Sequence, residues 1–355
     1  MTNIKHPEFS KSLSDGRLEC TLCPRACKLD DMQRGLCFVR QRNGNSIALT
    51  TYGRSSGFVI DPIEKKPLNH FLPGSPILSF GTAGCNLSCK FCQNWDISKS
   101  REMDTLQSSA SPDAIASAAI KHGCRAVAFT YNDPVIFYEY AIDTAISCHQ
   151  RGLKTVAVTA GYISDQARSG FFHHMDAANV DLKSFSDGFY INHCGGSLSV
   201  VLDTLLYLVK ETEVWVEITN LIIPGENDSP DELKSMTAWI ANNLGDHIPL
   251  HFSAFHPDYK FTNRSATPHK TLMQAKEIAH NNGLKHVYLG NVRDVDNAST
   301  YCPNCGVLII GRSGYELTEW HINHSGTCNK CGSLTNGCFE DEPGHWGNRY
   351  ERIRI

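Results

Sequence analysis

The segment from residue 77 to residue 289 alternates short apolar runs with amphipathic stretches of ten or more residues. This alternation is typical of βα units around a parallel sheet. Ser111-Pro112 and Ser229-Pro230 have the form of helix starts, an N-cap followed by proline. Six βα units and a short seventh strand favour an α/β fold with a partial, open (βα)6 TIM-like barrel over a closed (βα)8 barrel. The expected strands are 77–82, 126–130, 154–159, 178–182, 213–219, 250–254 and 285–289, and the expected helices are 112–122, 135–150, 164–174, 199–211, 230–243 and 270–282.

Cysteine usage is the second constraint. The chain has 355 residues and 15 cysteines, and eleven of these cysteines fall into three groups. The first residues lack the apolar core of a signal peptide, so clustered cysteines indicate metal ligation rather than disulfides. No run of 18 apolar residues occurs, the net charge is −4 and no long basic run is present. These features predict a cytoplasmic protein with no membrane span and no nucleic-acid partner.

The loop expected after the first strand carries Cys85, Cys89 and Cys92 in a C-x3-C-x2-C spacing, with Phe91 directly before the third cysteine. Three thiolates can hold three irons of a [4Fe–4S] cube and leave the fourth iron without a protein ligand, whereas ferredoxins supply four cysteines. Something else is then expected to bind the last iron. A zinc site that lacks one ligand, or three unrelated core cysteines, are the alternatives.

Two further groups supply four cysteines each. The N-terminal group has the spacing C-x2-C-x3-C-x9-C, which fits structural zinc. An auxiliary iron–sulfur cluster, free thiols and a redox disulfide are the alternative interpretations. The C-terminal group, C-x2-C-x22-C-x2-C with a glycine after each pair, is typical of a zinc ribbon, with an auxiliary cluster or rubredoxin-like iron as alternatives. The groups are Cys20, Cys23, Cys27 and Cys37, and Cys302, Cys305, Cys328 and Cys331.

These patterns predict three parts of the chain. Residues 1–75 would form an N-terminal cysteine-rich element and a strap, residues 76–295 the barrel, and residues 296–355 a zinc-ribbon-like domain. The strap, residues 61–75, is rich in proline, which predicts an ordered loop rather than a helix. Its basic residues, Lys65, Lys66 and His70, either line a substrate entrance or belong to a solvated strap beneath the barrel.

Polar residues follow the expected strands one after another. Reactive groups of such barrels lie on the loops at the carboxyl ends of the strands, so these residues should form one rim. Structural alternatives remain for Asp181, which could hold Lys183, and for Glu217 and His251, which could be satisfied inside the core. The rim candidates are Tyr131, Asn132, Asp133, Asp181, Lys183, His251, His256 and Tyr259.

The cysteine loop, with its aromatic residue before the third cysteine, resembles the radical S-adenosylmethionine (SAM) enzymes. The barrel motifs are similar to the branch that includes the pyruvate formate-lyase activating enzymes. Residues 20 to 335 resemble one subgroup more closely, the radical SAM proteins of the AmmeMemoRadiSam system. The shared motifs are CTLCP, DPIEKKPL, CKFCQNW, DLK, FHPDY and the CP-CG tail.

This resemblance implies a site. SAM would bind the open iron of a cluster held by Cys85, Cys89 and Cys92, with Phe91 near its adenine. Tyr131, Asn132 and Asp133 stand where activating enzymes have Gly-Gly-Glu, which contacts the SAM amino group. Lys183 matches a lysine that contacts the SAM carboxylate, and His251 matches a histidine with the same role.

The implied function is a SAM-cleaving enzyme whose 5′-deoxyadenosyl radical abstracts hydrogen from a small substrate. Asp181, His256 and Tyr259 are the substrate candidates. One alternative is a glycyl-radical activase that acts on a protein partner. Another is a non-catalytic iron–sulfur and zinc electron carrier or scaffold. The expected partners are SAM, a low-potential donor such as flavodoxin or ferredoxin, and Memo-like proteins of the same pathway.

Overall fold

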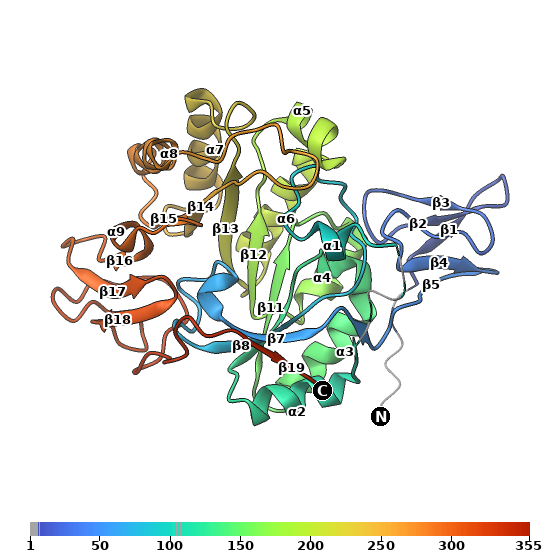
Figure 1. Cartoon of the computed structure of the whole chain (residues 1–355), viewed down its shortest axis with the longest axis horizontal. Coiled ribbons are helices and arrows are strands. Elements are labelled where there is room, and N and C mark those ends of the chain that lie inside the picture. The colour runs from blue at the N-terminus through green and yellow to red at the C-terminus, as the bar shows by residue number, and fades with distance from the viewer. Residues whose placement is uncertain (1–5, 7, 102, 104–105, 107) are drawn as a thin grey trace.

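The computed structural model describes residues 6, 8–101, 103, 106 and 108–355. Its centre is a nine-stranded sheet that curves into a partial barrel (Figure 1). Along the sheet the strands are β15 (Val287–Gly290), β14 (Leu250–Ala254), β13 (Trp215–Ile222), β12 (Ala177–Asp181), β11 (Lys154–Thr159), β10 (Ala126–Phe129), β8 (Pro76–Phe80), β7 (Phe58–Pro62) and β19 (Glu351–Ile353).

Neighbouring strands from β8 to β15 pair in parallel, which confirms the predicted α/β partial barrel. The sequence did not predict two edge strands. β7 pairs antiparallel with β8, and β19 pairs antiparallel with β7. β7 begins after Gly57 and ends in the proline-rich strap, so its apolar run is short. β19 has three residues, and its partner lies almost 300 positions earlier in the chain, so no local pattern indicates this pairing.

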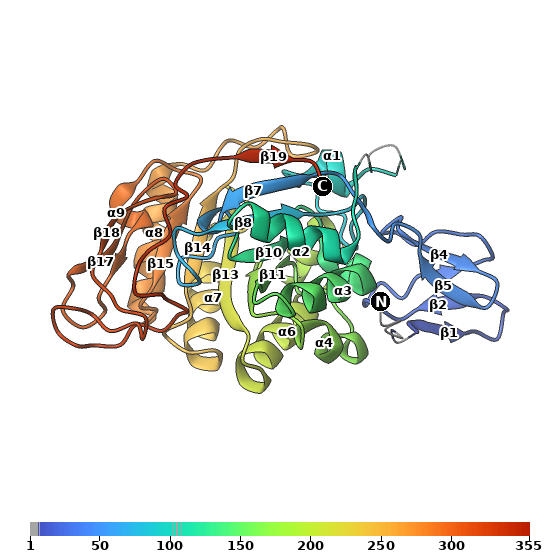
Figure 2. The same ribbon diagram turned by 90° about the horizontal axis from the view of Figure 1, so that it is seen from below.

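Each predicted helix is present within a few residues of its expected bounds. Ser111 Oγ caps α2 (Pro112–Lys121) by accepting a hydrogen bond from Ala114 N at 3.2 Å. Ser229 Oγ caps α7 (Pro230–Asn243) by accepting one from Glu232 N at 3.3 Å. The expected helix 135–150 begins as a 3₁₀ turn, η3 (Pro134–Phe137). Figure 2 shows that the long helices cover the outside of the sheet. They are α2 (Pro112–Lys121), α3 (Tyr138–His149), α4 (Asp165–Phe172), α6 (Leu198–Glu211), α7 (Pro230–Asn243) and α8 (His269–Asn281).

Short helical turns lie in the connections between the strands. They are η1 (Ile63–Lys65), α1 (Trp95–Ser98), α5 (Asp187–Phe189), the π-helical turn η4 (Tyr190–Cys194) and α9 (Val295–Ala298). None of the helices in the described part of the chain is long and apolar enough to span a membrane.

The strap fills the barrel from the amino ends of its strands. Leu68 and Phe71 are buried in a second apolar cluster with inward-facing residues of β8, β10, β11 and β12. Asn179 Nδ2 donates a hydrogen bond to Pro67 O at 2.8 Å. Lys66 and His70 are buried as well, and Lys65 is exposed. The strap is therefore a plug, neither a substrate entrance nor a solvated segment.

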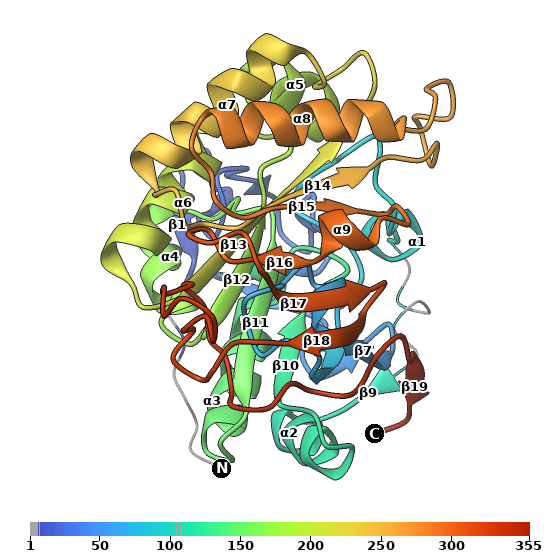
Figure 3. The same ribbon diagram turned by 90° about the vertical axis from the view of Figure 1, so that its left-hand side faces the viewer.

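The two cysteine-rich ends lie on opposite sides of the barrel (Figure 1). Residues 1–5 and 7 of the expected N-terminal element lie outside the described residues. Figure 3 shows the C-terminal strands in front of the barrel, with β19 returning to the barrel sheet. The N-terminal strands are β1 (Ser10–Ser12), β2 (Leu18–Cys20), β3 (Lys28–Leu29), β4 (Arg40–Asn43), β5 (Ser46–Leu49) and β6 (Arg54–Ser55), which pairs with β9 (Ser108–Ser109). The C-terminal strands are β16 (Thr300–Tyr301), β17 (Leu308–Ser313) and β18 (Glu316–Trp320).

Candidate active site

The cluster loop, residues 81–95, leaves β8 and is fixed by the loop after β10. Asn132 Oδ1 accepts a hydrogen bond from Thr82 N at 3.1 Å, and Asn132 Nδ2 donates to Gly84 O at 2.7 Å. Gly84 has a φ of +80°, and a Cβ there would lie 2.0 Å from Cys37 O. Only glycine allows the N-terminal element to approach the cluster loop this closely.

The three thiols of the cluster loop are free. Cys89 is buried, whereas Cys85 and Cys92 are partly exposed. Cys92 Sγ lies 3.0 Å from Ser98 Oγ at the end of α1. Three thiol ligands on one loop, with a hydroxyl beside one of them, fit a three-cysteine iron–sulfur cluster.

The charges around Cys89 favour its thiolate, which is the form that binds metal. A hydrogen bond from Cys194 is the main cause that lowers the pKa of Cys89 to about 6, and the positive charges of Lys183 and Lys99 lower it further. Lys99 Nζ also donates to Leu87 O at 2.8 Å, which holds the lysine against the loop. Burial, by contrast, raises the pKa of Cys85 to about 12, so the surroundings favour the thiolate at Cys89 and oppose it at Cys85.

The end of β12 brings Lys183 to the cluster loop. Lys183 Nζ lies 2.9 Å from Asp181 Oδ2 and 6.0 Å from the centre of the Phe91 ring. Burial alone would lower the pKa of Lys183, but the negative charge of Asp181 raises it well above its ordinary value. The Lys183 ammonium is thus held in its charged form beside Phe91 and Cys89. Asp181 holds Lys183, as the structural alternative for Asp181 predicted.

The side chains of Tyr131, Asn132 and Asp133 are already engaged. Tyr131 has a φ of +70°, and its hydroxyl donates to Asp61 Oδ2 at 3.1 Å, away from the cluster loop. Asp133 Oδ2 accepts a hydrogen bond from Ala160 N at 2.9 Å, and burial raises the pKa of Asp133 to about 6. A contact from this stretch to a ligand would therefore come from backbone carbonyls.

His251 lies inside the barrel and is paired with an acid. Its Nε2 is 2.6 Å from Glu217 Oε2, and its ring is buried. Glu217 also accepts hydrogen bonds from the backbone N–H groups of Asn69 and His70, at 3.0 and 2.8 Å. One ring nitrogen of His251 is therefore committed to joining the strap and the sheet.

The loop after β14 reaches the cluster loop across the mouth of the barrel. Gln93 Nε2 and His256 Nδ1 are 2.9 Å apart, and the rings of Trp95 and Tyr259 stack with centroids 5.8 Å apart. Trp95 Nε1 donates to Asp258 Oδ1 at 3.0 Å. His256 and Tyr259 thus belong to one partly exposed rim with the end of the cluster loop.

The sequence did not predict the contribution of η4. Ser88 N and Lys90 N donate hydrogen bonds to the carbonyls of Cys194 and His193, at 2.8 and 2.9 Å, so this turn carries the middle of the cluster loop. The Cys194 side chain is buried and reaches Cys89. A cysteine outside the three groups was the only signal in the sequence.

The C-terminal cysteines are gathered as metal ligands. Their four sulfurs lie within 4.8 Å of one another, with Cys302 and Cys331 at 3.5 Å and Cys305 and Cys328 at 4.0 Å. With a zinc–sulfur distance of 2.3 Å, a tetrahedral site needs sulfurs roughly 3.8 Å apart. The quartet therefore fits a single tetrahedral ion.

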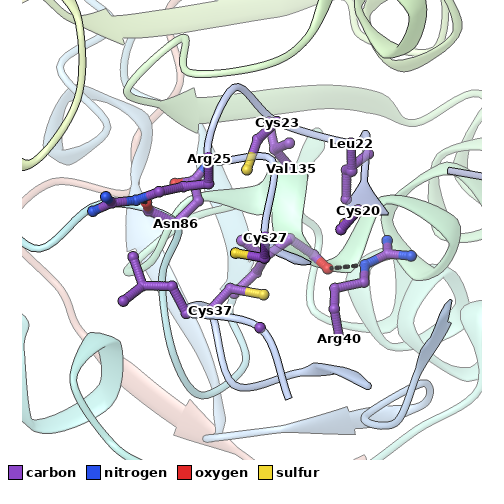
Figure 4. A pocket seen from close by; sticks show the side chains of 12 residues that line it. Cys20, Leu22, Cys23, Arg25, Cys27, Cys37, Arg40, Asn86 and Val135 are labelled. Carbon is purple, nitrogen blue, oxygen red and sulfur yellow. Dashed lines mark hydrogen bonds between the residues drawn. The ribbon is translucent and has the colours of Figure 1, made fainter. Parts of the chain in front are cut away.

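The N-terminal cysteines surround a cavity where the element meets the barrel (Figure 4). Figure 4 shows the sulfurs of Cys23, Cys27 and Cys37 turned into the same space. The other lining residues are Cys20, Leu22, Arg25, Gly35, Leu36, Arg40, Asn86, Val135 and Ile136.

Comparisons with known proteins relate this chain to a family of enzymes. The family model described as the radical SAM superfamily matches residues 80–237. The uncharacterized protein MJ0808 of Methanocaldococcus jannaschii is 40% identical over 309 residues, which are 87% of this chain and 92% of that protein. A pyruvate formate-lyase-activating enzyme of Clostridium pasteurianum is 25% identical over 45% of this chain and 67% of that enzyme.

One solved structure is similar across most of its length. The radical SAM methyltransferase of Sphaerobacter thermophilus has a TM-score of 0.50 at 16% identity, and the match covers 67% of this chain and 71% of that structure. At this identity the likeness concerns the fold alone.

Proposed function

The chain belongs to the radical SAM superfamily, and we propose that it cleaves SAM reductively to abstract hydrogen from a small organic substrate. The observation that carries the proposal is the convergence of Cys89, Lys183 and Phe91 at the carboxyl ends of parallel strands. When bound, a [4Fe–4S] cluster supplies the electron that splits SAM into methionine and a 5′-deoxyadenosyl radical. The protein must hold these groups and exclude water.

Each side chain near the cluster loop then has a role. Cys85, Cys89 and Cys92 hold the cluster. The Lys183 ammonium, with its charge maintained by Asp181, binds the SAM carboxylate, since an ammonium only donates hydrogen bonds. Phe91 lies against the adenine.

Two of the expected SAM contacts use backbone carbonyls of residues 131–133 and the second ring nitrogen of His251. The amino group of SAM donates to backbone carbonyls of residues 131–133, whose side chains are engaged elsewhere. His251 remains a proposed carboxylate contact, through the ring nitrogen that does not face Glu217.

A small substrate suits the mouth of the barrel. The Trp95–Tyr259 stack and the Gln93–His256 contact join the cluster loop to the loop after β14 across this mouth. These contacts narrow the opening through which a loop of a partner protein would have to enter. Asp181, His256 and Tyr259 are the side chains proposed to meet the substrate. We also propose that the chain belongs to the AmmeMemoRadiSam-system subgroup and that the C-terminal quartet binds zinc.

Anaerobic reconstitution with iron and sulfide tests the proposal. With dithionite and SAM, the protein should release 5′-deoxyadenosine and methionine in equal amounts. Cys89→Ala should abolish this release. Cys148→Ala, which removes a buried thiol of α3 outside the three groups, should retain it. Wild-type release no greater than that of Cys89→Ala would refute the proposed function.

The similarity to the pyruvate formate-lyase-activating enzyme of Clostridium pasteurianum favours glycyl-radical activation as a second candidate function. In that case the radical would move to a glycine of a partner protein. A glycyl doublet in the EPR spectrum of a candidate partner, formed only with SAM and this protein, would support activation over small-molecule chemistry.

A further inference from the structure

We propose that Cys20, Cys23, Cys27 and Cys37 hold a second iron–sulfur cluster, which relays electrons to the three-cysteine site. All four residues line one cavity at the contact between the N-terminal element and the barrel (Figure 4). The relay rests on the proposed function, whereas the presence of the cluster does not.

The spacing of the sulfurs separates this group from a zinc site. Among the described residues, only the C-terminal quartet brings three or more ligand atoms within 4.8 Å of one another. In the part of the chain that the structure describes, no three of the N-terminal thiols meet within that distance, and neither do Cys85, Cys89 and Cys92 together. A cube places each thiolate on a different iron, so its sulfurs lie farther apart than the ligands of a single ion. The N-terminal group therefore resembles the iron–sulfur loop and differs from the zinc-like quartet.

The lining of the cavity is formed by thiols and apolar side chains. Leu22, Val135 and Ile136 supply apolar contact, and the two arginines of the lining are engaged with protein acceptors. Arg40 is buried, and its guanidinium is held by Glu139, at 2.5 and 2.7 Å, and by Ile136 O at 3.0 Å. Because four cysteines leave no iron open, the cluster would carry electrons rather than bind a substrate.

The two cysteine loops are in direct contact. Arg25 Nε donates a hydrogen bond to Asn86 O at 3.1 Å, one residue from Cys85. The Cys37 carbonyl packs on Gly84, where a Cβ would lie only 2.0 Å away. A flavodoxin-type donor would give one electron to the N-terminal cluster, which passes it to the three-cysteine cluster. No bond forms or breaks, and no proton moves.

Iron counting in a variant that lacks the SAM site tests the second cluster. In Cys85→Ala/Cys89→Ala/Cys92→Ala, prepared as the full chain, about four irons per chain should remain of roughly eight in the wild type. The reduced variant should keep a cluster EPR signal that added SAM does not change. Zinc without iron in this variant, with about four irons in the wild type, would overturn the proposal.

The reverse variant tests the relay. Cys23→Ala/Cys37→Ala should lose about half of the iron and keep the EPR signal that responds to SAM, which also shows that the chain is folded. Reduction of that remaining cluster by reduced flavodoxin, followed by stopped flow, should slow at least tenfold relative to Cys148→Ala. Equal rates would refute the relay. Failure to release 5′-deoxyadenosine would refute only the proposed function, because iron counts do not depend on SAM cleavage.

Discussion

At the scale of single residues, buried polar side chains of the barrel are held by carboxylates, at the end of the same strand for Lys183 and on the neighbouring strand for His251. Lys183 is fixed by Asp181, and His251 is fixed by Glu217. Burial of such charges is tolerated only where each one is paired or hydrogen-bonded. The two pairs differ in their surroundings, since Lys183 faces the cluster loop and Glu217 faces the strap.

Replacing Lys183 by Met should reduce SAM cleavage without unfolding the chain. The loss of one charged hydrogen bond, about 1.5–3 kcal/mol, corresponds to roughly a 10- to 100-fold decrease in kcat/KM for SAM. The 5′-deoxyadenosine rate at several SAM concentrations measures it. Lys285→Met, at the exposed pair with Asp246, is the matched control and should retain the wild-type rate. Equal rates for Lys183→Met and the control would exclude a contact with SAM.

Glu217→Gln should lower the free energy of unfolding and make that free energy depend less on pH in the acid range. Burial alone would raise the pKa of Glu217, but the hydrogen bond and charge of His251 lower it below its ordinary value. A carboxyl with a lowered folded-state pKa adds stability above its unfolded-state pKa and loses that stability as the pH falls through the folded value.

The unfolding free energy of the wild type should therefore decline below about pH 4. At neutral pH the Gln variant should be less stable by about 2–3 kcal/mol, because backbone donors of the strap lose a charged acceptor. Urea titrations at a series of pH values measure both effects. The exposed Glu277→Gln should keep the wild-type curve, and parallel curves for Glu217→Gln and the wild type would contradict the linkage.

At the scale of elements, local sequence determined the helices better than the irregular segments. Ser–Pro starts and the glycines after α2, α3 and α8, which all have positive φ, fix the helix ends through short-range contacts. The strap and η4 are shaped instead by partners far along the chain. The hairpin β17–β18 depends on its cysteine knuckles, because its apolar cluster is small.

Metal removal should therefore unfold the C-terminal hairpin selectively. Cys302→Ser/Cys305→Ser should lose about one zinc per chain and keep its iron. Hydrogen exchange of residues 302–331 should accelerate at least tenfold, since the ion supplies folding free energy to such small units. Exchange in α3 and α6 serves as the internal control. Unchanged zinc content would show that the quartet does not hold the ion.

At the scale of the whole molecule, a buried arginine attaches each cysteine-rich end to the barrel. Arg40 reaches Glu139 of α3. Arg312 of β17 donates to Asn69 O of the strap at 2.6 Å and to Thr300 Oγ1 at 2.8 Å. β19 also returns the chain to the edge of the sheet, beside β7. The ends are therefore packed onto the barrel rather than tethered to it.

Arg312→Met should loosen the C-terminal part from the strap. The strap carbonyl and Thr300 would lose a charged donor, and a decrease of about 2–4 kcal/mol in unfolding free energy is expected. Thermal unfolding and the protease sensitivity of residues 300–350 measure the change. The exposed Arg293→Met is the control. A melting temperature equal to that of the control would show that β19 and the apolar contacts suffice for attachment.

The sequence by itself determined the βα order, the helix ends and the three cysteine groups, because periodicity, caps and ligand spacing are local properties of the chain. Only the tertiary structure decided that the strap plugs the barrel, that Cys194 reaches Cys89 and that Cys37 packs on Gly84. It also separated the two four-cysteine groups by the spacing of their sulfurs. These features join residues that are distant in the chain, so the free energy of packing fixes them and no local pattern encodes them.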